Sequence, residues 1–186
     1  MVIGVVLSLG MHNNQQAFAE NEKNENYDAL LKVLQQSKVS LCEGLRQAVK
    51  GAEAPISAKF ELDDKGKLSL SIYTAEKGLA VDSQNNVFKE LSGSPESVKW
   101  NPESEVIKDE GDLVHAKEQL TVLSKAKISL LDLVTKAEKD YHGTVFAAFP
   151  EVKDNKYVCE VKIAQDGQVS EHYYDVVTGN EVKMGE

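Results

Sequence analysis

The chain has 186 residues, of which 41% are hydrophobic and 27% are charged, and its formal net charge is -9. This composition suits one globular domain or two small ones. The acidic balance argues against nucleic acid and anionic membrane surfaces as partners, because contacts to phosphate need clustered Lys and Arg.

The beginning of the chain has the pattern of a secretory signal. The apolar run Val2–Gly10 is too short to cross a bilayer as a helix, which takes about 20 residues. An Ala-Phe-Ala segment that ends at Ala19 has the small-x-small form of a cleavage site. We therefore predict a signal peptide at residues 1–19, a periplasmic or extracellular location, and no membrane insertion after its removal. No Lys or Arg precedes the apolar run, so either the true start lies upstream or the signal is atypical.

Two segments have apolar residues at helical spacing, residues 27–49 and residues 120–137. Ser40 and Ser129 are placed to cap a fresh helix inside or beside these segments. One kinked helix and two consecutive helices are therefore both open in each half of the chain.

Alternating apolar and polar residues follow each helical segment and predict antiparallel strands with one buried and one solvated face. Turn residues such as Asp63-Asp-Lys-Gly66 separate the strands. The predicted strands are 56–62, 68–73 and a short strand towards Val81 in the first half, and 145–152, 157–163 and 169–175 in the second.

The chain matches itself when it is shifted by 89 residues. Ten identities occur in the 41 positions from 38 to 78 without a gap. They are at Lys38, Ser40, Leu41, Ala48, Lys50, Ala58, Phe60, Lys67, Ala75 and Gly78. The apolar pattern is kept as well, which indicates an internal duplication.

We therefore predict an α+β fold made of two tandem repeats. Each repeat is a helix, kinked or split, that packs on a three- to four-stranded antiparallel β-meander. The first repeat spans residues 20–92, a linker rich in Ser, Pro and Glu spans 93–115, and the second repeat spans 116–186.

The end of the second repeat carries a resemblance to a known family. Asp175, Thr178, Gly179 and Val182 resemble the closing strand and turn of a PepSY domain, and the first repeat has Asp82 and Val87 with two Asn residues in place of Thr-Gly. Asn tolerates positive φ, so we expect the turn to survive there, and we interpret the Asp and Thr side chains as turn caps. Each half of the chain thus resembles a PepSY domain.

This resemblance implies an exported or cell-envelope protein that binds other proteins, including the inhibition or regulation of peptidases. Tandem β-lactamase inhibitory proteins are similar in plan, since they join two helix-plus-sheet units. The expected partner is a peptidase or another envelope protein.

Motifs for catalysis, metal ligation or cofactor binding are not found in the sequence. His12, His115, His142 and His172 have no His or Cys partner at metal-ligand spacing, and the acidic clusters at 61–64 and 109–112 lack an EF-hand pattern. We predict no enzyme activity, no cofactor and no metal. Cys42 and Cys159 form either a disulfide or two separate buried thiols, and the apolar pattern around each favours separate thiols.

The predicted function is a non-catalytic protein-binding module that engages its partner through a sheet face free of helices. The side chains expected on that face are Ser69, Ser71 and Tyr73 in the first repeat and Val158, Glu160 and Lys162 in the second. Tyr73 is the expected anchor, because aromatic residues dominate the energetics of interfaces. The alternative is a periplasmic protein that binds a small molecule or metal ion between the repeats.

Overall fold

The computed structural model describes residues 27–184 and has an α+β fold. The predicted signal peptide at residues 1–19 lies outside the described residues. The described chain forms four helices and one eight-stranded antiparallel sheet. The elements in chain order are α2 (Asp28–Leu34), α3 (Leu41–Ala48), β1 (Ala54–Leu62), β2 (Leu68–Ala75), β3 (Phe88–Gly93), β4 (Glu103–Val106), α4 (Glu110–Leu123), α5 (Leu130–Asp140), β5 (Thr144–Lys153), β6 (Lys156–Gln165), β7 (Gln168–Asp175) and β8 (Glu181–Val182).

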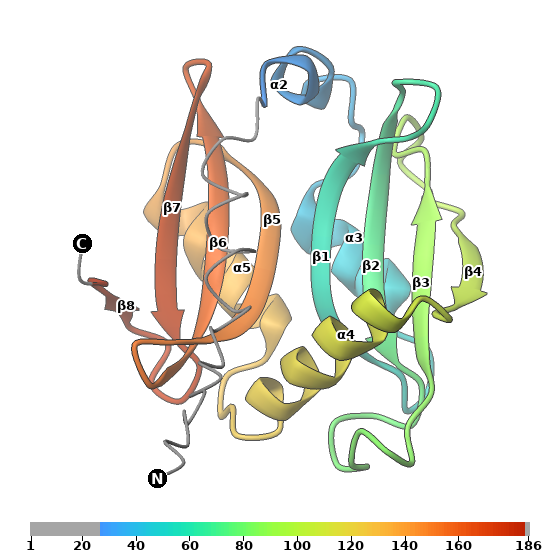
Figure 1. Ribbon diagram of the computed structural model, residues 1–186. Coiled ribbons are helices and arrows are strands. Elements are labelled where there is room, and N and C mark those ends of the chain that lie inside the picture. Colours follow the sequence, from blue (N-terminus) through green and yellow to red (C-terminus); the bar gives the residue numbers. More distant parts are fainter. Residues whose placement is uncertain (1–26, 185–186) are drawn as a thin grey trace, which may run out of the picture.

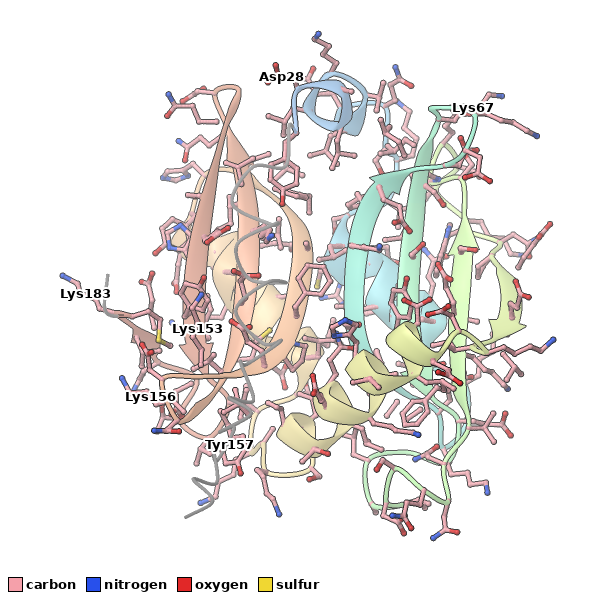
Figure 2. The ribbon with its side chains drawn as sticks, viewed as in Figure 1. Asp28, Lys67, Lys153, Lys156, Tyr157 and Lys183 are labelled. Atoms are coloured by element: carbon pink, nitrogen blue, oxygen red, sulfur yellow. The ribbon has the colours of Figure 1, made fainter. Side chains whose placement is uncertain are left out.

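The strand order in the sheet is β4-β3-β2-β1-β5-β6-β7-β8, so each half of the chain forms one half of the sheet (Figure 1). The first strands of the two halves, β1 and β5, lie side by side in the middle. The β1–β2 and β5–β6 hairpins point to opposite ends of the sheet, as Lys67 and Lys156 show (Figure 2). This continuous sheet is a feature that the prediction of separate meanders did not include.

The joint between the halves is short. Only Ala58 with Ala148 and Lys59 with Ala147 are paired between β1 and β5, whereas each outer pair of long strands has a register of six to nine residue pairs. Three of the four residues at the joint are alanines, and Ala58 and Ala148 are completely buried. The two halves therefore approach each other through small side chains.

Helices α3 and α5 cover one face of the sheet and contact each other (Figure 1). Ser40 and Ser129 cap them, since each hydroxyl accepts a hydrogen bond from the backbone N–H three residues further on. Gly44 lets α3 approach the sheet, because a Cβ added there would lie 2.5 Å from Leu70 Cδ2. The apolar side chains of β1, β2, β5 and β6 that point to this side form the core with the two helices.

Helix α4 lies on the opposite face of the sheet, across β1 and β5 (Figure 1). The Ser57 hydroxyl donates a 2.8 Å hydrogen bond to Gln119 Oε1 of α4, and Ser57 points away from the side of Ala58. The expectation of a helix-free face is therefore wrong in the middle of the sheet. Leu120 and Leu123 of α4 are buried, which means that this helix has an apolar side that must pack against the rest of the protein.

The helical segments of the sequence are two consecutive helices in each half, which decides between the two open interpretations. The predicted strand towards Val81 is wrong, because residues 76–87 form a loop that the side chain of Asn86 organises. That side chain accepts from the Lys77 N–H and donates to the carbonyls of Gly78 and Val81. The segment 93–115, assigned to a linker by sequence, contains β4 and the start of α4.

In β1 and β5 the sequence match and the structure disagree by one residue. The shift of 89 residues equates Ala58 with Ala147, but Ala58 pairs with Ala148 and therefore shares its face instead. Phe60 and Phe149, a second identical pair, also lie on opposite faces, because Phe60 is paired with Leu70 and Phe149 with Glu160. A slip of one residue moves a strand's side chains to the other face of a sheet. The identities in this strand therefore do not correspond in the structure, whereas the identical residues Ser40 and Ser129 both cap a helix.

We predict that the joint between β1 and β5 tolerates no larger side chain. Ala148→Leu adds three carbon atoms at a completely buried position, so the free energy of unfolding is expected to fall by about 1–3 kcal/mol. Urea unfolding followed by circular dichroism measures this change. Ala80→Leu, at an exposed position in the loop before β3, is the control and should change stability by less than about 0.5 kcal/mol. Equal stability of Ala148→Leu and the native protein would contradict the packing described for the joint.

Candidate functional site

The candidate site is the sheet face opposite α3 and α5, which we call the polar face. In the first half of the sheet two rows of side chains cross it from β1 to β4. The first row is Ser57, Tyr73, Glu90 and Glu105, and the second is Lys59, Ser71, Ser92 and Glu103. Polar residues thus occupy this face next to α4, where a solvated face is expected in an antiparallel sheet.

All six residues that the sequence places at a binding surface point to the polar face. Their burial differs from the expectation of an open surface. Tyr73 and Ser69 are half-buried, whereas the other four are buried, namely Ser71, Val158, Glu160 and Lys162. Tyr73 and Ser69, both on β2, are the most exposed of the six, so the accessible part of the predicted surface lies in the first half of the sheet.

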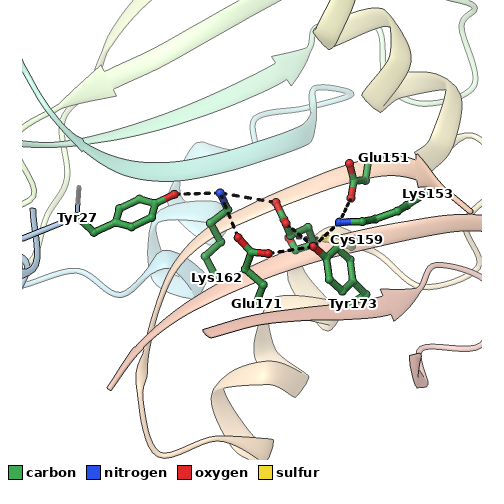
Figure 3. A network of polar contacts seen from close by, with 8 residues as sticks. Tyr27, Glu151, Lys153, Cys159, Lys162, Glu171 and Tyr173 are labelled. Atoms are coloured by element: carbon green, nitrogen blue, oxygen red, sulfur yellow. Dashed lines mark hydrogen bonds and ion pairs between the residues drawn. The ribbon is translucent and has the colours of Figure 1, made fainter. Parts of the chain in front are cut away.

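The second half of the polar face holds a network of buried charges (Figure 3). Lys162 Nζ donates a 3.0 Å hydrogen bond to the Tyr27 hydroxyl and lies 3.9 Å from carboxylate oxygens of Glu160 and Glu171. The Tyr173 hydroxyl donates to Glu160 Oε1 at 2.7 Å. Burial, together with this bond to a carboxylate, raises the pKa of Tyr173 well above its ordinary value.

The network of Glu160, Lys162 and Tyr173 is satisfied within the protein. A buried charge is costly unless it is paired and hydrogen-bonded, and here a lysine, two carboxylates and two tyrosines supply one another's partners. Losing one member would leave an uncompensated charge. We interpret this half of the polar face as structural.

The first half of the polar face has a smaller network around Tyr73. Lys59 Nζ lies 2.6 Å from Glu61 Oε2 and 5.9 Å from the centre of the Tyr73 ring, and Ser71 donates to Glu61 Oε1 at 2.6 Å. Burial raises the pKa of Tyr73 to about 12, and the nearby carboxylates add to this rise while Lys59 opposes it. The Tyr73 hydroxyl has no hydrogen-bond partner among residues 27–184, which leaves it available to a partner.

Two carboxylates lie near Tyr73 on the outer strands, and one of them, Glu90, is close enough to Lys59 to interact with its charge. Glu90 of β3 lies directly opposite Glu105 of β4, and like charges in this position destabilise a sheet by about 0.2–1 kcal/mol. Neither makes an ion pair within the described part of the chain. Asp112 of α4 is also close enough to raise the pKa of Tyr73. Sequence reasoning missed Glu90 and Glu105, because β3 and β4 were not predicted as strands. The apolar residues Phe88 and Leu91 were the signal of a buried segment there.

The turn after β7 is built as the sequence predicts. Asp175 Oδ1 accepts hydrogen bonds from the backbone N–H groups of Val177 and Thr178 and from the Thr178 hydroxyl. Gly179 adopts a positive φ of 69° and Val182 pairs with Tyr173 in the sheet. Asp175 and Thr178 therefore cap a turn, and their groups are used within it.

The matching turn of the first half differs in place and conformation. Asp82 Oδ1 accepts from the backbone N–H groups of Gln84 and Asn85, so the cap is present. However, Asn85 and Asn86 do not have positive φ, contrary to expectation. The Asp82 turn also precedes the third strand of its half, whereas the Asp175 turn follows the third strand. The two turns are alike locally but are not equivalent in topology.

Ser170, His172 and Glu181 form a chain of hydrogen bonds on the sheet face that α3 and α5 cover. His172 Nε2 lies 3.0 Å from Ser170 Oγ, and His172 Nδ1 lies 2.8 Å from Glu181 Oε1, which also accepts from Tyr141. This connectivity is that of an acid-base relay to a serine. Chemistry at a serine also needs a substrate pocket and donors for a developing oxyanion. Because Ser170 and His172 belong to β7 and Glu181 belongs to β8, these hydrogen bonds link β8 to β7.

Two cavities of about 300 and 270 Å³ lie between the loop before β3 and α4. Both cavities are open to solvent. The larger one is lined by Phe88, Ile107, Leu113 and Lys117, and the smaller one by Leu79, Asp82 and Leu120.

Within residues 27–184 no group of three or more His, Cys, Asp or Glu side chains is placed to hold a metal ion. None of the helices in this range combines the length and apolar character needed to cross a membrane.

Cys42 and Cys159 are free and buried, which agrees with two separate thiols. Cys42 Sγ lies 3.1 Å from Thr135 Oγ1, where α3 meets α5. Burial raises the pKa of the Cys159 thiol far above its usual range. Both cysteines act as small core residues.

No protein-family model matches the chain, and neither a curated protein nor a solved structure matches it. The resemblance to PepSY domains therefore rests on the residues of the chain itself.

We predict that Asp175→Ala lowers the free energy of unfolding by about 1 kcal/mol at neutral pH, because the turn loses a side-chain cap. Hydrogen bonding by the Thr178 N–H keeps the pKa of Asp175 below 3.8 in the folded protein. Its stabilisation is therefore present at pH values above 3.8 and is lost as the pH falls through the lowered pKa.

Urea unfolding of Asp175→Ala and the native protein over a series of pH values measures this dependence. Asp64→Ala, in the exposed turn between β1 and β2, is the control and should have little effect. If the loss for Asp175→Ala stayed constant down to the most acidic pH, the charge of the carboxylate would not be the source of the stabilisation.

Proposed function

We propose that the protein is an exported, non-catalytic module that binds a basic segment of another protein through the first half of the polar face. The observation that carries this proposal is the row Tyr73, Glu90 and Glu105, in which a half-exposed aromatic ring lies beside two carboxylates that oppose each other. A sheet that keeps like charges in register gives up stability, and a cationic partner restores it. The overall charge of -9 attracts the same class of partner.

The proposed contact places Tyr73 at the centre and carboxylates at the rim. An aromatic ring with an unused hydroxyl offers both apolar contact and a hydrogen bond, which is typical of residues that dominate interface energetics. Arginine suits such a site, because its guanidinium stacks on aromatic rings and binds carboxylates with two parallel hydrogen bonds. The partner in this proposal is a peptidase or another envelope protein whose binding region is basic, and binding inhibits or regulates it.

We also propose that the chain is a duplicated PepSY-like unit of split helix and four-stranded meander. The order of elements is the same from α2 to β4 as from α4 to β8, and the strand order is symmetric about the β1–β5 joint. The serine caps of α3 and α5 and the identities around them agree with duplication. The one-residue slip between β1 and β5 requires one residue to have been inserted before β5 and one removed from the following hairpin.

A second candidate is the binding of a small molecule in the larger cavity. The cavity lies where α4 of the second half meets the loop of the first half, as the alternative function requires. Its volume of about 300 Å³ is at the lower limit for ligand pockets, about 300–1,000 Å³. Its lining has one charged side chain, Lys117, and it is open to solvent, so it supports this function less well than the polar face supports protein binding.

We expect Tyr73→Ala to abolish capture of the partner protein. Immobilised full chain is incubated with an envelope or culture extract, and bound proteins are quantified by mass spectrometry. Loss of a central aromatic contact weakens an interface by at least about 2 kcal/mol, which is roughly thirtyfold in affinity.

The control is Tyr157→Ala, which removes an exposed ring at the end of the β5–β6 hairpin in the other half of the sheet (Figure 2). A captured protein should be lost with Tyr73→Ala and retained with Tyr157→Ala. If both variants capture the same proteins as the native chain, Tyr73 is not at the interface.

Glu105→Gln should stabilise the free protein and weaken the complex. Removing one of two opposed charges is expected to raise the free energy of unfolding by about 0.2–1 kcal/mol. The same change removes attraction for a cationic partner, so binding should fall and should depend less on salt concentration. Urea unfolding and salt-dependent capture measure the two effects. A variant that is less stable, or that binds more tightly, would refute this assignment of Glu105.

A further inference from the structure

The outer edge of the first half of the sheet is an exposed strand. All four residues of β4 are exposed, from Glu103 to Val106, and β4 is the last strand on its side of the sheet. An edge strand presents unpaired backbone N–H and C=O groups to which another extended segment can be added.

The register identifies which backbone groups of β4 do not pair with β3. The Ile107 N–H donates to the Phe88 carbonyl at 3.0 Å, so odd-numbered residues on this side face β3. In an antiparallel pair the hydrogen-bonded positions alternate with non-bonded ones. The N–H and C=O groups of Ser104 and Val106 therefore point outward from the edge.

The side chains along the edge are strongly acidic on one face. Glu103 and Glu105 lie on the polar face, while Ser104 and Val106 lie on the side of α3. Residues 103–112 contain five carboxylates and one lysine, Lys108. The exposed Val106 and the larger cavity add an apolar surface at the end of β4.

We infer that a basic, extended segment of the partner adds to β4 as a ninth, antiparallel strand. Lysine or arginine residues of this segment lie opposite Glu103 and Glu105, and apolar residues lie opposite Ser104 and Val106. The cationic side chain opposite Glu105 lies in the same row as Glu90, which is two strand spacings of about 4.8 Å away. This inference rests on the proposed function, because it describes how the same partner approaches the same face.

A second copy of the chain is a poor occupant of this edge. Pairing of two β4 strands would bring Glu103 and Glu105 of one copy against carboxylates of the other, and like charges directly opposite are unfavourable. The same charges that discourage self-association select a cationic strand.

The test uses a synthetic peptide with the sequence Lys-Val-Lys-Val-Lys-Val and titration calorimetry with the full chain. If valines lie opposite Ser104 and Val106, the valine N–H groups point at β4 and the lysine N–H groups point away. N-methylation of the valines is expected to weaken binding by about tenfold or more, because backbone hydrogen bonds are lost. N-methylation of the lysines, the matched control of identical composition, should leave binding nearly unchanged.

On the protein, Ser104→Pro removes an outward N–H without removing a ladder bond to β3, and proline is tolerated at such edge positions. It should weaken binding of the unmodified peptide by about tenfold, and Glu105→Lys by at least as much. Circular dichroism and the melting temperature check that each variant is folded, and the N-methylated peptides test the same pairing on unaltered protein.

The two proposals fail in different ways. If valine and lysine N-methylation have the same effect, or if the native chain does not bind the unmodified peptide, strand addition at β4 is wrong. If Tyr73→Ala captures the same proteins from the extract as the native chain, the proposed polar-face function is wrong whatever the peptide does.

Discussion

The contact between β1 and β5 is the constraint on which the rest of the molecule depends. Two residue pairs join β1 and β5, and three of their four side chains are methyl groups. Because alanine is small on both faces, α3 and α5 can pack together beneath the joint while α4 crosses above it. One continuous sheet results, and the apolar sides of both halves share a single core. The polar face exists as one surface because of this joint.

Much of the local structure is predictable from the sequence, because side-chain period is a local property. The helices, the two long hairpins and the Asp175 turn are examples. Strand β4 is not predictable in this way, since it is fully exposed and has no alternation of apolar residues. The joint is not predictable either, because nothing in the local pattern around Ala58 distinguishes a strand that pairs with the other half from a sheet edge.

The placement of α4 also lies beyond local pattern. Ala116, Leu120, Val122 and Leu123 are buried although they do not all lie on one side of the helix, and Val114 is exposed. Such a distribution does not say which sheet face the helix covers. For the same reason only part of the candidate site could be located from the sequence. Strand alternation pointed to Tyr73, but only cross-strand pairing shows that Glu90 and Glu105 lie in the same row.

The two halves of the polar face show how one architecture supports two different outcomes. In the second half, Lys162 stands where the first half has Tyr73, and Tyr173 from β7 closes its network with Glu160. In the first half, β3 supplies Glu90 opposite Tyr73, as β7 supplies Glu171 opposite Lys162, but a tyrosine replaces the lysine, so Glu90 makes no ion pair among the described residues. A buried polar network whose members are all hydrogen-bonded or ion-paired helps to specify the structure. Surface charges without such partners can instead interact with another protein. We propose that this difference in charge balance directs a basic partner to the first half of the sheet and to its acidic edge.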